Sequence, residues 1–156
     1  MKSFFKLAIC VLIPLLIGVI SGITTADNIN TWFIYLNKPF FNPPNYLFGP
    51  VWTTLYILMG YSLYRILNQP QTTSKKKALI IYSIQLFLNF CWSFLFFKFH
   101  LLGLAFCEIL LLLSSIIWMI ISFYKLDKIA SYLNIPYLLW VSFASVLNIS
   151  FWWLNK

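Results

Sequence analysis

The sequence predicts an all-α integral membrane protein, a bundle of five transmembrane helices with a proline-rich loop between the first two helices. Of its 156 residues, 62% are hydrophobic and 9% are charged, whereas a soluble domain is roughly half apolar and about a quarter charged. A water-soluble domain of this length needs a mostly polar exterior, and this composition does not supply one. We therefore expect lipid to surround most of the chain.

Five apolar stretches account for the predicted helices, because each is long enough to cross a hydrocarbon core, which needs about 20 helical residues. Their uninterrupted apolar runs do not alternate in polarity, which excludes membrane-spanning β-strands. We expect a single domain over residues 1–156, with helices at about residues 4–22, 46–67, 78–97, 101–123 and 129–153.

The first stretch, residues 4–22, has a second interpretation as a secretory signal, because Lys2 and Lys6 precede its apolar run. The run is longer than the roughly 7 to 15 apolar residues of such a signal. Gly18 and Gly22 also form a GxxxG spacing, which is typical of close helix packing in membranes. We therefore favour a retained helix and interpret this glycine pair as a packing surface only.

The longest connection, residues 23–45, contains Lys38-Pro39 and a second proline-rich run that ends at Asn45. Proline cannot continue a helix, so we expect this loop to cover one end of the bundle. The next connection, residues 68–77, ends in three lysines and is expected to be a short solvated loop.

Basic residues lie mainly at the ends of the apolar stretches, so the net charge of +8 does not indicate a nucleic-acid-binding surface. If successive connections alternate between the two sides, eight Lys and Arg fall on the side of the N-terminus and three on the other. The positive-inside rule then predicts a cytoplasmic N-terminus and an external C-terminus in a bacterial plasma membrane. An outer or organelle membrane is the alternative.

Residues that commonly bind metals are few and scattered. Cys10, Cys91 and Cys107 all lie in apolar runs without metal-ligand spacing, and we interpret them as small buried residues. His100 is the only histidine, and we interpret it as structural, with haem ligation as the alternative. We predict no metal site and no cofactor.

Polar side chains inside an apolar helix are costly in lipid, so they indicate contacts or function. Their spacing on the third predicted helix places five residues on one inward face: Gln85, Asn89, Trp92, Ser93 and Phe96. Two interpretations of this stripe stay open, interhelical hydrogen bonding and the wall of a ligand cavity.

Glu108 is the only acidic residue within a predicted helix. We expect its carboxyl group to pair with a lysine or to hydrogen-bond to an amide side chain of the third helix. A proton relay or a catalytic acid is the alternative role for this residue.

Aromatic residues make up 21% of the chain, and some of them belong to the belts expected at the membrane surface. Trp52 and Trp140 differ, because they lie inside their predicted helices beside prolines and small residues, which favours an interior position. Flat aromatic walls suit a planar apolar ligand that is bound by stacking and dispersion.

Four motifs follow one another along the chain. The longest covers the first loop and the start of the second helix: Trp32-x3-Leu36-x-Lys38-Pro39-x3-Pro43-Pro44-x3-Phe48-Gly49-Pro50-Val51-Trp52-x2-Leu55-Tyr56-x2-Met59-Gly60. Three more follow: Gln85-Leu86-x-Leu88-Asn89-x2-Trp92-Ser93-x2-Phe96-Phe97, Gly103-Leu104-Ala105-x2-Glu108, and Pro136-Tyr137-x2-Trp140-x2-Phe143-Ala144-x2-Leu147-Asn148-x3-Trp152. Over residues 32–152 the sequence resembles the translocator protein (tryptophan-rich sensory protein) family.

The resemblance implies a five-helix bundle, commonly a homodimer, with a cavity that opens toward the first loop. It also implies binding of porphyrins or haem-like ligands, of synthetic isoquinoline and benzodiazepine ligands and, in animal members, of cholesterol. Ile149 and Trp153 stand where animal members carry the Tyr and Arg of a proposed cholesterol motif, so we place cholesterol below porphyrin. The cavity-lining residues carried over from the family are Trp32, Pro50, Trp52, Asn89, Trp92, Trp140, Ala144 and Leu147.

We therefore expect a membrane receptor or sensor for porphyrins and related apolar ligands. A transporter is the second hypothesis, although the broken helices or inverted repeats typical of transporters are not evident in the sequence. The third hypothesis is a porphyrin-degrading enzyme. The resemblance supports it because some bacterial members are associated with light-dependent breakdown of protoporphyrin, and the matching tryptophans are Trp52 and Trp140.

Overall fold

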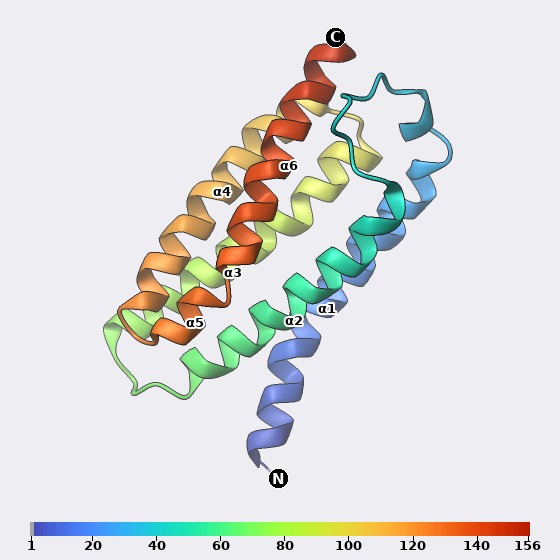
Figure 1. Cartoon of the computed structure of the whole chain (residues 1–156). Coiled ribbons are helices and arrows are strands. Elements are labelled where there is room, and N and C mark those ends of the chain that lie inside the picture. Colours follow the sequence, from blue (N-terminus) through green and yellow to red (C-terminus); the bar gives the residue numbers. More distant parts are fainter. Residues whose placement is uncertain (1) are drawn as a thin grey trace.

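Figure 1 shows the computed structural model of the chain as a bundle of long helices, with a loop over the end near the C-terminus. The structure describes residues 2–156, and this part of the chain contains helices and loops without a β-strand. Four segments are long and apolar enough to cross a membrane: Ser3–Ile29, Thr73–Lys98, Leu102–Tyr124 and Lys128–Leu154. The prediction of an all-α fold with helices suited to a membrane is confirmed.

The first helix, α1 (Lys2–Ile29), continues past its predicted end at Gly22 into the segment predicted as loop. Polar residues in this extension remain helical because their side chains bond to the helix itself. Thr24, Thr25 and Asn28 each donate a side-chain hydrogen bond to the carbonyl four residues earlier, at 3.3, 2.9 and 2.9 Å. These bonds satisfy the polar groups without water, so the helix does not need to end where the apolar run ends.

The loop after α1 contains two short 3-10 helices, Phe33–Tyr35 and Asn45–Leu47, with the proline-rich segment between them. The next helix, α2 (Phe48–Leu67), has 20 residues, but its aromatic and polar side chains keep it out of the set of four strongly apolar segments. α2 packs closely against α1 at Gly60, where an added Cβ atom would lie only 2.5 Å from the Cα atom of Val11.

The third helix, α3 (Thr73–Ser93), begins earlier than predicted, so the three lysines expected in a loop lie in its first turns. Thr72 explains this start, because its Oγ1 accepts a hydrogen bond from the Lys75 N–H at 3.2 Å and caps the helix. A π-helical turn, Phe94–Lys98, follows α3. The next helix, α4 (Leu102–Tyr124), packs along α3.

The last predicted helix is divided into α5 (Lys128–Tyr132) and α6 (Ile135–Leu154). Pro136 lies in the first turn of α6, where its missing N–H is tolerated but prevents a continuous helix from α5. Asn134 lies at the break, fully buried, and donates a hydrogen bond to Ser62 Oγ of α2 at 2.7 Å. The break is therefore fixed by contacts with a neighbouring helix.

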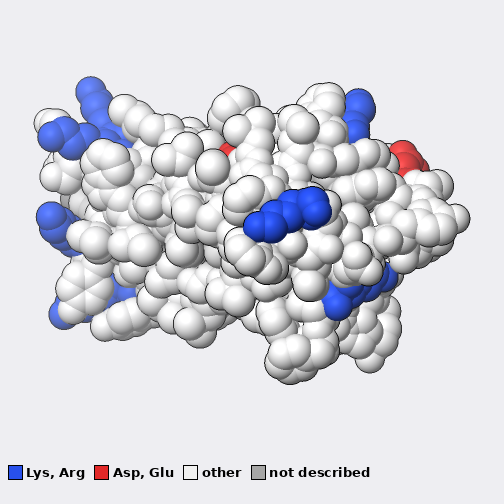
Figure 2. Space-filling view, turned by 90° about the horizontal axis from the view of Figure 1, so that it is seen from above, with Lys and Arg blue, Asp and Glu red and all other residues white. Residues whose placement is uncertain are grey.

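Charged side chains form a network at the end of the bundle opposite the proline-rich loop. Arg65 Nη2 lies 2.9 Å from an Asp127 carboxylate oxygen. Lys6 and Lys75 both donate to the carbonyl of Leu67 at the C-terminal end of α2, at 3.1 and 2.9 Å, where the helix dipole favours cations. Figure 2 shows a broad uncharged surface with most Lys and Arg toward its margins. Which end of the bundle faces the cytoplasm stays a prediction.

Candidate ligand-binding site

A cavity of about 350 Å³ lies between α1, α2, α3 and α6, beside the proline-rich loop. Nine aromatic side chains line it: Phe33, Phe48, Trp52, Tyr56, Trp92, Phe96, Phe97, Trp140 and Phe151. No charged side chain is present among the lining residues that the structure describes. The cavity therefore suits an apolar molecule with rings rather than an ion.

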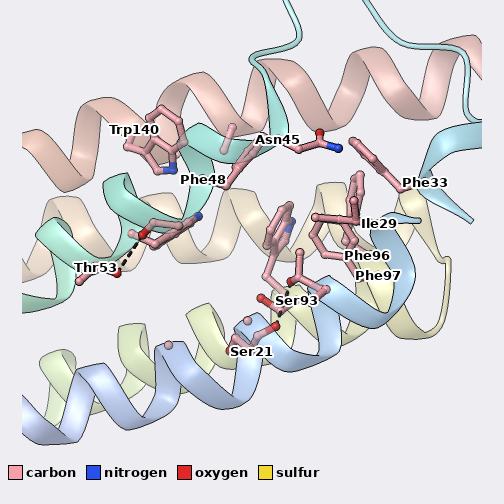
Figure 3. A pocket seen from close by; sticks show the side chains of 18 of the residues that line it. Ser21, Ile29, Phe33, Asn45, Phe48, Thr53, Ser93, Phe96, Phe97 and Trp140 are labelled. Atoms are coloured by element: carbon pink, nitrogen blue, oxygen red, sulfur yellow. Dashed lines mark hydrogen bonds between the residues drawn. The ribbon is translucent and has the colours of Figure 1, made fainter. Parts of the chain in front are cut away.

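Two tryptophans from different helices face this cavity. Trp52 of α2 stacks on Tyr56, with ring centroids 5.5 Å apart and an angle of 26° between the planes. Trp140 of α6 meets Phe48 edge-on, with centroids 6.0 Å apart, as Figure 3 shows at one side of the cavity. These contacts orient both indoles, and both remain partly exposed, so a ligand can touch them.

Five of the eight residues carried over from the family line the cavity: Trp52, Trp92, Trp140, Ala144 and Leu147. The other three lie outside its wall. Trp32 stacks on His100, with centroids 4.0 Å apart. Pro50 lines a separate shallow groove between α2 and α6. Asn89 lies behind the wall, where it contacts Tyr56.

The polar stripe of α3 serves both roles predicted for it, because some of its residues form interhelical hydrogen bonds and some line the cavity. Asn89 accepts a hydrogen bond from the Tyr56 hydroxyl at 2.7 Å and donates one to the Tyr137 hydroxyl at 3.1 Å. Trp92 combines both roles, because it lines the cavity and its Nε1 donates to Asn148 Oδ1 at 3.0 Å. These bonds join α3 to α2 and α6, so they hold the cavity wall in place.

The proline-rich loop closes one end of the cavity. Phe33 and Asn45 of this loop line the cavity, as Figure 3 shows. The loop is attached to the end of α6, because the Asn37 N–H donates to Asn155 Oδ1 at 2.8 Å and Asn155 Nδ2 donates to the Asn37 carbonyl at 3.0 Å. Phe33 also packs against Phe151 of α6, with centroids 5.2 Å apart.

The cavity is open along one side, between α1 and α2. Val19 on α1 is 58% exposed although it lines the cavity. Four more residues line the cavity and are exposed: Gly22 and Ala26 on α1, and Gly49 and Thr53 on α2. These exposed lining residues form the opening of the cavity on this side.

The α1 wall is the part of the site that the sequence reasoning missed. A Cβ atom added at Gly18 would clash with the Tyr56 ring, whereas one added at Gly22 would meet no atom within 4 Å. Gly18 therefore serves packing, and the interpretation of the pair as a packing surface only is wrong for Gly22. The available signal was the run of small residues that continues along this face through Thr25 and Ala26.

Three other candidate residues lie outside the cavity. Glu108 is 8% exposed, and neither of its carboxyl oxygens has a hydrogen-bond partner in the part of the chain that the structure describes. Its predicted pairing with a lysine or an amide is therefore wrong. His100 contacts Asn28, with 3.3 Å between Nε2 and Oδ1, in addition to its stacking on Trp32. Cys107 is exposed rather than buried.

The sequence model of the TspO/MBR family matches residues 10–154, which include most of every helix around the cavity. This chain belongs to the TspO/MBR family. Its TspO/MBR relatives include the Tryptophan-rich protein TspO of Archaeoglobus fulgidus, which is 42% identical over 98% of this chain and 99% of its own length. The human Translocator protein is 34% identical over 78% of this chain and 73% of its own length. The Tryptophan-rich sensory protein of Cereibacter sphaeroides is 34% identical over 75% of this chain and 72% of its own length.

Membership of the TspO/MBR family and the four apolar helices identify the chain as a multi-pass integral membrane protein. Three of the four motifs that resemble this family in the sequence lie on the helices and the loop that surround the cavity, and the fourth, Gly103 to Glu108, lies on α4. The family relationship therefore covers the site as well as the fold.

Proposed function

We propose that this TspO/MBR protein is a membrane receptor or sensor that binds porphyrins and related planar, apolar ligands between α1, α2, α3 and α6. The observation that carries the proposal is a cavity of about 350 Å³ that has nine aromatic lining residues and no charged one among those described. Flat aromatic molecules gain stacking and dispersion in such a site. The names of two relatives, a translocator protein and a sensory protein, support a role in recognising a ligand.

The carboxylates of a porphyrin would find no cation in the cavity wall, so we expect them to stay at its mouth. Lys38 of the proline-rich loop is placed to meet them, because its Nζ lies 4.7 Å from the ring centroid of Phe33, a lining residue. The ring system would then enter the cavity while the charged groups stay near the exposed loop. This arrangement avoids burying an unpaired charge.

The test is a titration of detergent-purified protein with protoporphyrin in darkness, followed by tryptophan fluorescence. Saturable quenching supports the proposal. Ala144→Phe is a useful control, because the added ring projects from a lining position and should reduce binding by filling the cavity. Failure of the unaltered protein to bind protoporphyrin, isoquinoline and benzodiazepine ligands would contradict the proposal.

Light-dependent porphyrin breakdown is a second candidate function, favoured by the position of two oxidisable rings. Trp52 and Trp140 both line the cavity, and Trp52 stacks on Tyr56. A photoexcited porphyrin in the cavity would lie in contact with electron-donating indoles, so the ligand's own photochemistry would drive the reaction. Protein-dependent loss of the porphyrin absorption spectrum under light, but not in darkness, is the expected result.

We also propose that all five long helices cross a bacterial plasma membrane and that the protein is a homodimer. α2 belongs to this set because a helix of 20 residues spans about 30 Å at 1.5 Å per residue. A cysteine at Asn42 should be labelled from outside intact cells, and one at Lys76 should not. The reverse labelling pattern would overturn the orientation. Light scattering in detergent tests the dimer.

A further inference from the structure

The α1 wall of the cavity contains a hydroxyl group without a hydrogen-bond partner. Ser21 is 5% exposed and lines the cavity. Its Oγ bonds to no other group in the part of the chain that the structure describes. Figure 3 shows Ser21 on the α1 side of the cavity, among the side chains that line it.

Ser21 differs in this respect from four other serines in the helices. Ser83, Ser114, Ser142 and Ser145 each donate their hydroxyl hydrogen to the carbonyl four residues earlier, at 2.8–3.0 Å. This local bond is the usual way to satisfy a hydroxyl where water is absent. A buried hydroxyl that forgoes it lowers stability, so the exception indicates a role other than folding.

The residues around Ser21 leave room for a ligand on the same wall. Gly18, Gly22, Thr25 and Ala26 line the cavity together with Ser21, and all have small side chains or none. A Cβ atom added at Gly22 would have no neighbour within 4 Å. The Thr25 hydroxyl is already satisfied, because it donates to the Ser21 carbonyl at 2.9 Å. Among the lining residues that the structure describes, Ser21 Oγ is therefore the fully buried polar side-chain atom that lacks a hydrogen-bond partner.

We propose that Ser21 is the hydrogen-bonding anchor of the ligand site and that residues 18–26 of α1 form the surface on which a flat ligand lies. The proposal rests on the ligand-binding function proposed above and specifies the ligand class. Besides porphyrins, that class includes planar, uncharged ring systems with a hydrogen-bond acceptor, such as a carbonyl, at the edge that meets α1. The Ser21 side chain has a single heavy-atom torsion with three staggered states, so its hydroxyl can turn toward the ligand.

The test uses two uncharged planar probes of nearly the same shape, fluorenone with a carbonyl acceptor and fluorene without one. Both are titrated into detergent-purified full-length protein and followed by tryptophan fluorescence. Ser21→Ala should weaken fluorenone binding about threefold to tenfold, as expected for one net hydrogen bond, and should leave fluorene binding unchanged. Ser145→Ala is the matched control, because its buried hydroxyl is already bonded and lies outside the cavity.

Thermal unfolding supplies a second measurement. Ser21→Ala should not lower Tm, because the hydroxyl that it removes has no partner. Gly22→Leu should also keep Tm, since its side chain enters open space, but it should prevent both probes from binding. This variant tests the α1 surface independently of the hydroxyl.

The outcomes separate the two proposals. Unchanged fluorenone binding in Ser21→Ala, or an equal loss of both probes, would overturn the role of Ser21 as an anchor. Unchanged binding in Gly22→Leu would overturn the α1 surface. If the unaltered protein binds protoporphyrin but neither small probe, the ligand class is wrong while the proposed function stands. If it binds none of the three, the proposed function fails as well.

Discussion

Exchanging Trp52 tests whether the aromatic wall binds the ligand and takes part in photochemistry. Trp52→Phe keeps a ring beside Tyr56, on which the indole stacks at 5.5 Å, whereas Trp52→Ala removes the ring. We expect the Phe variant to keep porphyrin affinity within about tenfold, which corresponds to ~1.4 kcal/mol. Any light-driven loss of porphyrin should fall sharply in it, because phenyl is a poor electron donor. The Ala variant should impair both properties.

The size of the binding loss in Trp52→Ala follows from how the indole is held. Tyr56 occupies part of its surface, so a ligand can cover about a third of the 150–250 Å² that an aromatic side chain offers, or about 80 Å² at most. At about 25 cal/mol per Å², this contact contributes ~2 kcal/mol. The dissociation constant of porphyrin should therefore rise about thirtyfold.

The assay measures porphyrin binding in darkness and then follows porphyrin absorbance during timed illumination of the same samples. Trp118 provides the matched control, because it is 62% exposed on α4 and does not line the cavity. Trp118→Phe and Trp118→Ala should leave both measurements unchanged. If Trp52→Phe degrades porphyrin at the unaltered rate, the indole is not the electron donor. If Trp52→Ala binds porphyrin normally, the ligand lies elsewhere.

Asp127, Gly60 and Lys38 provide independent checks. Burial alone would raise the Asp127 pKa, but the Ala130 N–H and Arg65 outweigh it and hold the pKa below its ordinary value of 3.8. The Asp127 carboxylate should therefore stabilise the fold fully above pH 3.8, and this stabilisation should be lost as the pH falls below that value. In thermal melts, Asp127→Asn should lose less stability on acidification than the unaltered protein. An equal loss in both proteins would contradict the pairing with Arg65. Gly60→Ala should lower stability by about 1–3 kcal/mol in chemical unfolding, because its methyl would lie 2.5 Å from the α1 backbone; an unchanged midpoint would refute that contact. Lys38→Gln should weaken binding of protoporphyrin but not of its dimethyl ester, and equal effects on both would exclude a carboxylate contact.

The fold class follows from composition, whereas the helix ends do not. Helix-length apolar runs have few other solutions in lipid, so the all-α membrane fold was predictable. α1 extends through Thr24 and Thr25 because their hydroxyls bond to the preceding turn. The last helix is divided near Asn134, whose amide bonds to Ser62 of α2. Both features depend on specific hydrogen bonds, which a hydropathy pattern does not register.

The candidate site was partly predictable for a similar reason. Family motifs give the residue type at each position, but they do not give the rotation of each helix about its axis. Trp52 and Trp140 line the cavity, whereas Asn89 lies one layer behind them, bonded to Tyr56. Glu108 likewise lies on α4, which contributes no lining residue. The sequence pattern therefore did not indicate that the Glu108 carboxyl group has no hydrogen-bond partner among the described residues.

The open side of the cavity and the proposed binding surface have one origin: α1 and α2 are in close contact at Gly60 and Gly18 but not at Gly22. Gly60 permits close approach to the α1 backbone, and the Tyr56 ring fills the space at Gly18. No side chain fills the corresponding space at Gly22. A GxxxG spacing cannot distinguish its two glycines, because the partner helix decides which one is covered. A flat ligand beside Gly22 would supply the contact that α2 does not make there.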